Sequence, residues 1–215
     1  MDNYKENRAF MKSSFLEDTD IVATADIAKG IPQPLIEKLY PPDAYTISLP
    51  EVNRATAPKV DLFECMAIRC SRRVYTGEDL SLPELAFLLW CTQGIKQIIP
   101  GYKKYMKDGK NTLRPVPSGG AIHPYETYLA INHVEGVEPG VWRYLPLSHQ
   151  LLRLRAEQKL EKELPAIFSN PSQNQHYVSR AAVVFFWVCT PFTRVSGVTD
   201  TPPIRLCFCR GRWSR

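Results

Sequence analysis

The sequence has little of what marks a membrane, secreted or nucleic-acid-binding protein. Its longest apolar run, Ala181–Cys189, has nine residues, and a run of that length is too short to cross a bilayer. The first residues lack the apolar segment of a signal peptide. These absences favour a cytoplasmic protein without a membrane partner.

The six cysteines do not form a metal-binding pattern. Cys207-Phe208-Cys209 has the spacing of two ligands, but no second Cys or His pair matches it. We therefore expect no metal site. The cysteines are scattered and lie mostly in apolar context, which predicts free and mostly buried thiols in a reducing compartment.

Positive charge is concentrated at one end of the chain. The net charge is +5, and the segment from Arg194 onward holds five arginines against Asp200 alone. The rest of the chain has a net charge of about +1, which does not indicate the basic surface that a nucleic-acid partner would need. The apolar fraction of 44% is ordinary for a globular protein, and 215 residues suffice for one domain plus an arm.

Composition divides the chain into three parts. Residues 1–58 are rich in proline and predict an extended arm that packs on its own domain or on a partner subunit. Residues 59–193 carry the periodic segments of a domain. Residues 194–215 show no helical or strand period, although the apolar strand Ala181–Cys189 before them needs neighbours on both sides.

The periodic segments predict an α+β fold. Lys59–Arg69 is predicted to be an amphipathic helix, with Val60, Phe63, Met66 and Ala67 on one face. Ser81-Leu-Pro-Glu84 has the spacing of a capping box and begins an apolar helix that Gly94 closes. Another helix is predicted over Glu157–Phe168, and the strands over Tyr125–Asn132, Val141–Tyr144, Leu151–Arg155 and Ala181–Cys189.

A loop with two adjacent glycines precedes the first of these strands. It consists of Pro117, Ser118, Gly119, Gly120 and Ala121. Glycine carries no Cβ and adopts positive φ, so another group can lie against the backbone here. Such a loop suits a flat ligand with polar edges, and the alternative is a plain turn.

Two segments together resemble the nitroreductase-like flavoproteins. The first is Arg69-Cys70-Ser71-Arg72-Arg73, and the second is the Pro117–Ala121 loop. Within that family they are most similar to the SagB-type (azoline) dehydrogenase branch. The resemblance covers roughly residues 28–193. It implies an FMN-binding domain with a central mixed sheet flanked by helices, and a homodimer with FMN at the interface.

The resemblance also implies which residues bind FMN. Arg69, Ser71 and Arg73 would hold the phosphate, because two guanidiniums and a hydroxyl suit a dianion; the alternative is a pair of surface arginines. The loop would lie along the ring and ribityl chain. The expected cofactor-binding residues are Arg69, Cys70, Ser71, Arg73, Pro117, Ser118, Gly119, Gly120, Ala121 and His123.

Two neighbouring residues remain open. His123 would position the ring or a substrate, or it is a histidine satisfied by the backbone. Glu126 would balance Arg114 or Arg143. No side chain stands out as an acid–base catalyst, so the catalytic residues are unknown, and the resemblance implies that hydride transfer belongs to the cofactor.

The resemblance leaves two substrate classes open. One is an azoline in a modified peptide, which is oxidised; the other is a small nitroaromatic or quinone, which NAD(P)H reduces.

The chain also departs from the family. Members continue well beyond the equivalent of Phe192, with a dimer helix and a loop facing flavin N5. We expect a chain truncated or frameshifted after about residue 193, with a fold incomplete at its C-terminus. A remnant with weak or no flavin binding and no turnover is therefore the second hypothesis. A binding module that uses the basic tail on an anionic surface is the third.

Overall fold

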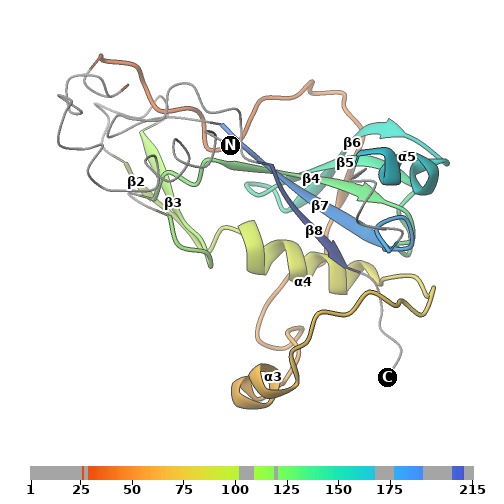
Figure 1. Ribbon diagram of the computed structural model, residues 1–215. Helices are drawn as coiled ribbons and strands as arrows, with labels where there is room; N and C mark the ends of the chain where they lie inside the picture. Colours follow the sequence, from red (N-terminus) through yellow and green to blue (C-terminus); the bar gives the residue numbers. More distant parts are fainter. Residues whose placement is uncertain are drawn as a thin grey trace, which may run out of the picture.

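The computed structural model describes residue 26 and residues 29–101, 109–118, 121–167, 177–190 and 205–210. Its main feature is a six-stranded sheet in the order β1-β6-β5-β4-β7-β8 (Figure 1). The strands are β1 (Thr46–Ser48), β4 (Tyr125–Ile131), β5 (Gly140–Leu145), β6 (Gln150–Ala156), β7 (Val183–Cys189) and β8 (Arg205–Arg210). A separate hairpin joins β2 (Gln97–Pro100) to β3 (Lys110–Leu113). The helices are α3 (Leu62–Ile68), α4 (Leu82–Gln93) and α5 (Leu160–Ile167).

The sheet is built from antiparallel pairs. Strands β4, β5 and β6 follow one another in the chain and pair as neighbours, while β7 returns along the other side of β4. All strand pairs of the described sheet are antiparallel. The expectation of a mixed sheet is therefore wrong for the described strands, and a parallel bridge between Leu80 and Val134 lies outside them. The four predicted strands are confirmed within a residue or two of their ends.

Gly140 is required where β5 begins beside β6. A Cβ at this position would meet the carbonyl oxygen of Arg155 closer than real contacts allow. Immediately after Gly140 in the chain, the pairing of β5 with β6 shifts its register between Val141 and Trp142. Such a bulge increases the local twist of the sheet, so Gly140 permits the close approach of the two strands at this point.

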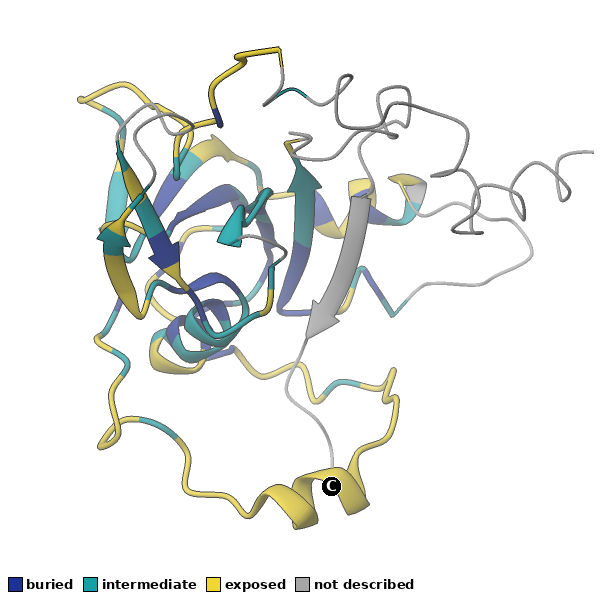
Figure 2. Ribbon diagram, turned by 90° about the vertical axis from the view of Figure 1, so that its left-hand side faces the viewer, coloured by how far each residue is buried: buried dark blue, intermediate teal, exposed yellow. Residues whose placement is uncertain are grey.

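Helix α4 covers one face of the sheet. The predicted capping box is confirmed: the Ser81 Oγ accepts from the Glu84 N–H, and the Glu84 carboxylate accepts from the Ser81 N–H at 3.0 Å. Leu85, Ala86 and Leu89 are fully buried (Figure 2). Full burial of one leucine is worth about 1.5–3 kcal/mol, so this face anchors the helix. At its end, a Cβ on Gly94 would lie 2.6 Å from the Trp90 side chain.

The opposite face carries α5 and a second, smaller core. Alternate residues of β7 divide between the two faces: Val183 and Phe185 pack with α4, and Val184 packs with Leu160 and Leu164 of α5. This alternation is the ordinary geometry of a strand. The expectation of a sheet flanked by helices is therefore confirmed.

The described part of the N-terminal arm packs on its own domain. Strand β1 pairs with β6 and forms one edge of the sheet. Earlier in the arm, the Leu147 N–H donates to the Glu37 carboxylate at 3.0 Å. Of the two alternatives, packing on its own domain is thus observed for residues 29–58.

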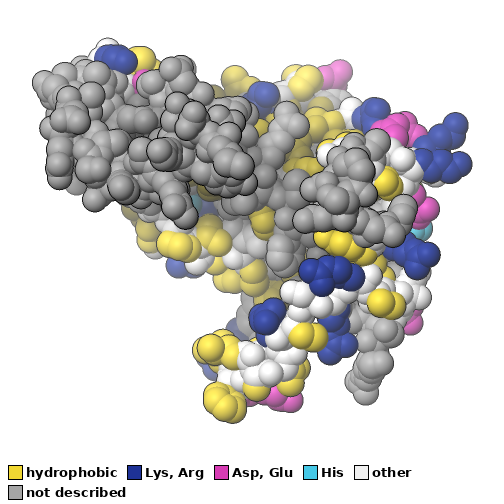
Figure 3. All heavy atoms as spheres, viewed as in Figure 1, with side chains coloured by type: hydrophobic (Ala, Val, Ile, Leu, Met, Phe, Trp, Pro, Cys, Tyr) yellow, Lys and Arg dark blue, Asp and Glu magenta, His cyan; other side chains and the backbone are white. Residues whose placement is uncertain are grey.

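Helix α3 projects away from the sheet (Figure 1). It begins three residues after the predicted start and ends at Ile68, and none of its residues is buried. Its apolar face is exposed, with Phe63 80% and Met66 70% accessible. In the space-filling view, hydrophobic side chains gather over this projecting part of the molecule (Figure 3). The sequence predicted the helix but could not show that its own chain leaves the apolar face uncovered.

Two further expectations are corrected. Strand β8 pairs with β7: Arg210 lies opposite Val183 at one end, and Arg205 lies opposite Val188 at the other. The tail therefore does supply a second neighbour for β7. The described cysteines are free but are not mostly buried: Cys65 and Cys70 are exposed, and Cys91 and Cys189 are partly exposed.

Within the described ranges, no helix is both long and apolar enough to cross a membrane.

Candidate functional site

The Pro117–Ala121 loop makes a tight turn before β4. Its described residues are Pro117, Ser118 and Ala121; the predicted ligands Gly119 and Gly120 lie outside the described residues. The Ala121 N–H donates to the Ser118 carbonyl at 3.0 Å, and the His123 N–H donates to the Ser118 Oγ at 2.9 Å. Ser118 thus closes the turn while keeping its own hydroxyl hydrogen as a donor.

Two residues after the glycines adopt positive φ. Ala121 has φ 53° and His123 has φ 46°. This region is uncommon for residues with a side chain and stores local strain, which clusters at functional sites. His149, in the turn between β5 and β6, has a positive φ of 52° as well, so this conformation by itself does not distinguish a ligand-binding loop from a plain turn.

A cavity of about 330 Å³ lies against this loop. Its lining includes Pro117, Ser118, His123 and Tyr125, together with Gln93 from the end of α4. Gln93 is 7% exposed, and its side-chain oxygen accepts from the Arg114 guanidinium at 3.2 Å. The cavity therefore has fixed polar groups on two sides.

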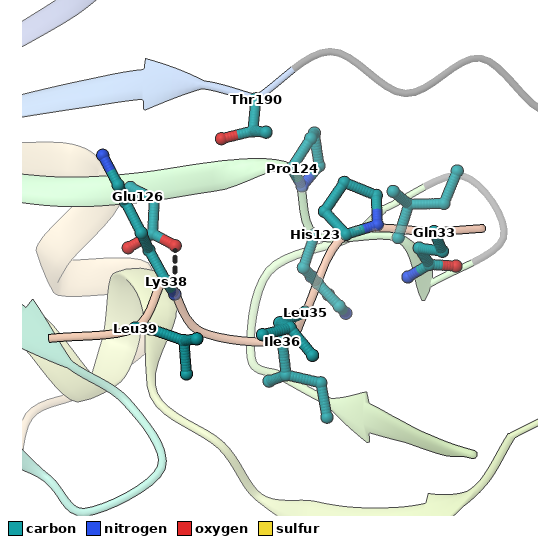
Figure 4. Close-up of a pocket in the computed structure, with 11 residues that line it drawn as sticks. Gln33, Leu35, Ile36, Lys38, Leu39, His123, Pro124, Glu126 and Thr190 are labelled. Carbon is teal, nitrogen blue, oxygen red and sulfur yellow. Dashed lines mark hydrogen bonds between the residues drawn. The ribbon is translucent and has the colours of Figure 1, made fainter. Parts of the chain in front are cut away.

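A larger cavity of about 500 Å³ lies on the other side of His123 and Pro124. The N-terminal arm forms one wall through residues 33–39, and Ile122, Glu126 and Thr190 complete it (Figure 4). Both cavities are lined by His123 and Pro124, so this pair separates them.

His123 is uncharged in this setting. Burial and, to a lesser degree, the nearby Arg114 guanidinium together lower the pKa of the imidazole to about 4, against the opposing effect of a hydrogen bond with the Thr112 backbone. The hydrogen bond with the Thr112 backbone supports the second reading that the sequence left open, a histidine satisfied by the backbone, and the ring also lines two cavities. Its ring therefore contributes a neutral donor or acceptor to them.

Glu126 contacts the arm. Its carboxylate accepts from the Lys38 N–H at 3.1 Å. It also acts electrostatically on Arg114, because it raises the pKa of that guanidinium while burial lowers it. The expected balance with Arg114 is thus observed, alongside a role that the sequence did not predict.

Sequence reasoning missed the two arginines that hold the arm. Arg143 is 3% exposed and donates to the Lys38 carbonyl at 2.6 Å. Arg114 is 6% exposed and donates to Gln93 and, at 3.5 Å, to the Ile36 carbonyl. The available signal was an arginine between Trp142 and Tyr144 in an apolar strand, since such an inward charge needs a partner.

The arginine segment lies directly after α3. Arg69 is the C-cap residue of the helix, and Arg69, Cys70, Ser71 and Arg73 are all exposed. The Arg73 guanidinium lies 5.7 Å from the centre of the Tyr177 ring. Within the described ranges, no ion pair involves Arg69 or Arg73. Both guanidiniums can therefore accept an anionic ligand.

The structure does not bring the two predicted segments together. The arginine segment leads to Tyr75, which packs with Ala130 and Val184 near one end of β4. The loop precedes Tyr125 at the other end. Seven residues of strand span roughly 20 Å. In Figure 1, the β2–β3 hairpin before the loop and α5 beside Tyr75 accordingly lie at opposite ends of the sheet.

Comparison with known proteins agrees with the resemblance. No protein-family model matches the chain. A curated Methanocaldococcus jannaschii protein named "putative nitroreductase" is 29% identical over 142 residues, which cover 66% of this chain. The chain spans 61% of the length of that relative. This similarity supports a place in the nitroreductase family, and it does not distinguish the SagB-type branch.

Two solved structures of proteins with the same designation were also found. The one from Anabaena variabilis is 28% identical, with a TM-score of 0.46, covering 69% of this chain and 28% of that protein. The one from Ralstonia eutropha is 22% identical, with a TM-score of 0.46, covering 74% and 62%. These TM-scores are too low to establish a shared fold.

Proposed function

We propose that the protein is an FMN-dependent oxidoreductase of the nitroreductase superfamily, similar to the SagB-type dehydrogenases. The observation that carries the proposal is the loop closed by Ser118, with positive φ at Ala121 and His123, against a cavity of about 330 Å³. The sequence similarity to a nitroreductase supports it independently.

The residues present fit FMN. Arg69, Ser71 and Arg73 are exposed and without an ion pair among the described residues, which suits a phosphate dianion. The loop offers the Ser118 hydroxyl and a preformed cavity to the ring. When bound, FMN supplies hydride transfer at N5. The role of this chain is then to bind, orient and shield the cofactor.

One chain cannot provide both parts of such a site, because the arginine segment and the loop lie at opposite ends of β4. A two-fold dimer solves this problem, since every contact of one copy is repeated by the other. Each site would then combine the arginines of one copy with the loop of its partner. The exposed apolar face of α3, including Leu62, Phe63 and Met66, provides a surface for this contact.

We propose a small uncharged molecule as substrate and NAD(P)H as the reductant. The cavity beside His123 measures about 500 Å³, which is within the range that binds small ligands. The modified-peptide substrate of the SagB-type branch is the second candidate within the same chemistry.

The test is an absorbance scan of the purified protein with FMN as titrant. A bound flavin gives a band near ~450 nm. Replacement of Arg69 and Arg73 by Ala should weaken FMN binding by about 100-fold, since each charged hydrogen bond is worth about 1.5–3 kcal/mol. The exposed Arg54, outside both segments, provides the control Arg54→Ala, which should retain full affinity.

The proposal fails if the wild-type protein is colourless and does not respond to FMN. A protein that binds FMN but does not oxidise NADH or NADPH in the presence of any acceptor would support the remnant hypothesis instead.

A further inference from the structure

The cavity between the arm and β4 has a largely apolar lining. Six of its residues contribute apolar side chains: Pro34, Leu35, Ile36, Leu39, Ile122 and Pro124. Leu39 is 79% exposed, and Thr190 at the end of β7 is exposed as well. The cavity therefore opens to solvent beside these two residues.

The charged groups of the lining cancel. Lys38 and Glu126 carry opposite charges, and separately the Glu126 carboxylate accepts a hydrogen bond from the backbone N–H of Lys38 at 3.1 Å (Figure 4). His123, the remaining titratable group of the lining, stays neutral because burial and Arg114 lower its pKa to about 4. An ion would lose its hydration here without gaining a net counter-charge.

The arm wall is fixed rather than adaptable. Arg143 donates to the Lys38 carbonyl at 2.6 Å, and the Leu147 N–H donates to Glu37 at 3.0 Å. Arg114 reaches the Ile36 carbonyl at 3.5 Å. These bonds hold residues 36–38, so a ligand meets a preformed wall and loses little binding energy to ordering it.

The position of the cavity links it to the loop. His123 and Pro124 line both this cavity and the one against Ser118. Only His123 and Pro124 would therefore separate a molecule in the larger cavity from a ligand bound against the Ser118 loop.

We infer that the N-terminal arm, through Pro34–Leu39, forms the substrate pocket of this protein, and that the pocket takes an uncharged, mainly apolar molecule. The assignment of this ligand as substrate rests on the proposed function. The existence and selectivity of the pocket rest only on its geometry.

Nile red, an uncharged fused-ring dye that fluoresces in apolar surroundings, tests the pocket without added FMN. Leu39→Glu places a charge at the opening, and Thr190→Trp fills it from the sheet side. Each should weaken binding at least about tenfold, because a charge or a bulky ring then opposes entry. Both positions are exposed, so the variants should fold.

The matched control is Leu154→Glu on β6, where the side chain is 48% exposed and lies outside this cavity, α3 and both predicted segments. This variant should bind the dye as the wild type does. Competition defines the ligand class: 2-naphthol should displace the dye, whereas 2-naphthoate, with the same rings and one negative charge, should displace it at least about tenfold less well.

Equal dye binding by wild type, Leu39→Glu and Thr190→Trp would overturn the pocket, and equal competition by the two naphthalenes would overturn the preference for uncharged ligands. The flavin band near ~450 nm reports separately on the proposed function. A pocket confirmed by the dye in a protein that ignores FMN would sustain the pocket and remove its role as a substrate site. If the protein binds flavin but neither variant changes its affinity for the dye, the proposed function is sustained and the pocket is overturned.

Discussion

Buried arginines determine where the arm lies. Arg143 donates to the Lys38 carbonyl, and its guanidinium also lies 5.6 Å from the centre of the Tyr40 ring. Arg153, on the next strand, is also close to a ring, at 4.3 Å from Tyr45, but it is more exposed and pairs with a surface carboxylate. The two residues allow a direct comparison of a buried and an exposed arginine.

We expect Arg143→Met to lower the free energy of unfolding by about 1–3 kcal/mol, because the Lys38 carbonyl loses a buried partner. Arg153→Met should cost at most about 1 kcal/mol, as exposed ion pairs do. Urea unfolding of both variants measures the difference. Equal losses would show that Arg143 does not anchor the arm.

His123 should make the protein less stable in acid. Its folded pKa of about 4 lies below the ordinary value of 6.5, so the unfolded chain binds more protons between these values. The stabilisation is complete above about pH 6.5 and is lost as the pH falls towards 4. Removing the titrating ring should therefore flatten the pH profile in this window.

The variant His123→Asn is suitable, because asparagine tolerates positive φ. Urea unfolding from pH 7 to 4 should show a smaller loss for the variant than for the wild type. His149, whose pKa burial also lowers, remains in both proteins and cancels in the comparison. An NMR titration that placed the His123 pKa at or above 6.5 would contradict the prediction.

At the scale of elements, α4 depends on its first turn. Ser81 and Glu84 satisfy each other's N–H groups, and the helix then buries Leu85 and Leu89 under the sheet. Ser81→Ala should lower the free energy of unfolding by about 1 kcal/mol, since a cap is lost. Ser81→Thr keeps a hydroxyl that accepts from the Glu84 N–H and donates to the Glu84 carboxylate, as the Ser81 Oγ does at 2.6 Å, and should change stability by much less. Urea unfolding compares them, and equal losses would mean that the cap contributes nothing.

At the scale of the whole molecule, the separation of the two segments predicts a shared site. The Arg69→Ala/Arg73→Ala protein lacks the proposed phosphate ligands, and Ser118→Trp fills the loop cavity of about 330 Å³. Alone, each should bind FMN too weakly to retain a flavin band at the concentration that saturates the wild type. When equal amounts of the two variants are mixed as monomers and allowed to dimerise again, half of the dimers contain one chain of each variant. Each of these mixed dimers has one intact site.

The mixture should therefore regain about a quarter of the wild-type FMN capacity, measured by the flavin band. A site made within one chain would regain none. Phe63→Glu on α3 should weaken the dimer in sedimentation without touching either FMN segment, so the restored capacity should fall when both mixed chains carry it.

Local elements were predictable because their signals are close in sequence. The Ser81–Glu84 box spans one helical turn, and the apolar runs of β4 and β7 need only neighbouring residues to be recognised. Strand β8 was missed because Arg205–Arg210 shows no alternation of apolar and polar residues, and only its pairing with β7 identifies it as a strand. The apolar face of α3 was predicted, but the sequence cannot show what covers a face.

The candidate site was predictable as chemistry but not as geometry. The sequence identified the arginine segment and the loop because their residue types suit a phosphate and a flat ring. It could not show that a chain places them at opposite ends of β4. Nor could it show that Arg143 would reach Lys38, 105 positions away in the chain.

The sequence by itself thus determined the three helices, the strands β4 to β7 and the capped start of α4, and it predicted two segments whose residue types suit FMN. Period, capping and residue type are local, and each can be read within a few residues. Only the tertiary structure decided that buried arginines hold the arm against β4, that His123 divides two cavities, and that α3 and its arginines project away from the loop. These features depend on contacts between residues far apart in the chain, and such contacts form only when the whole chain folds.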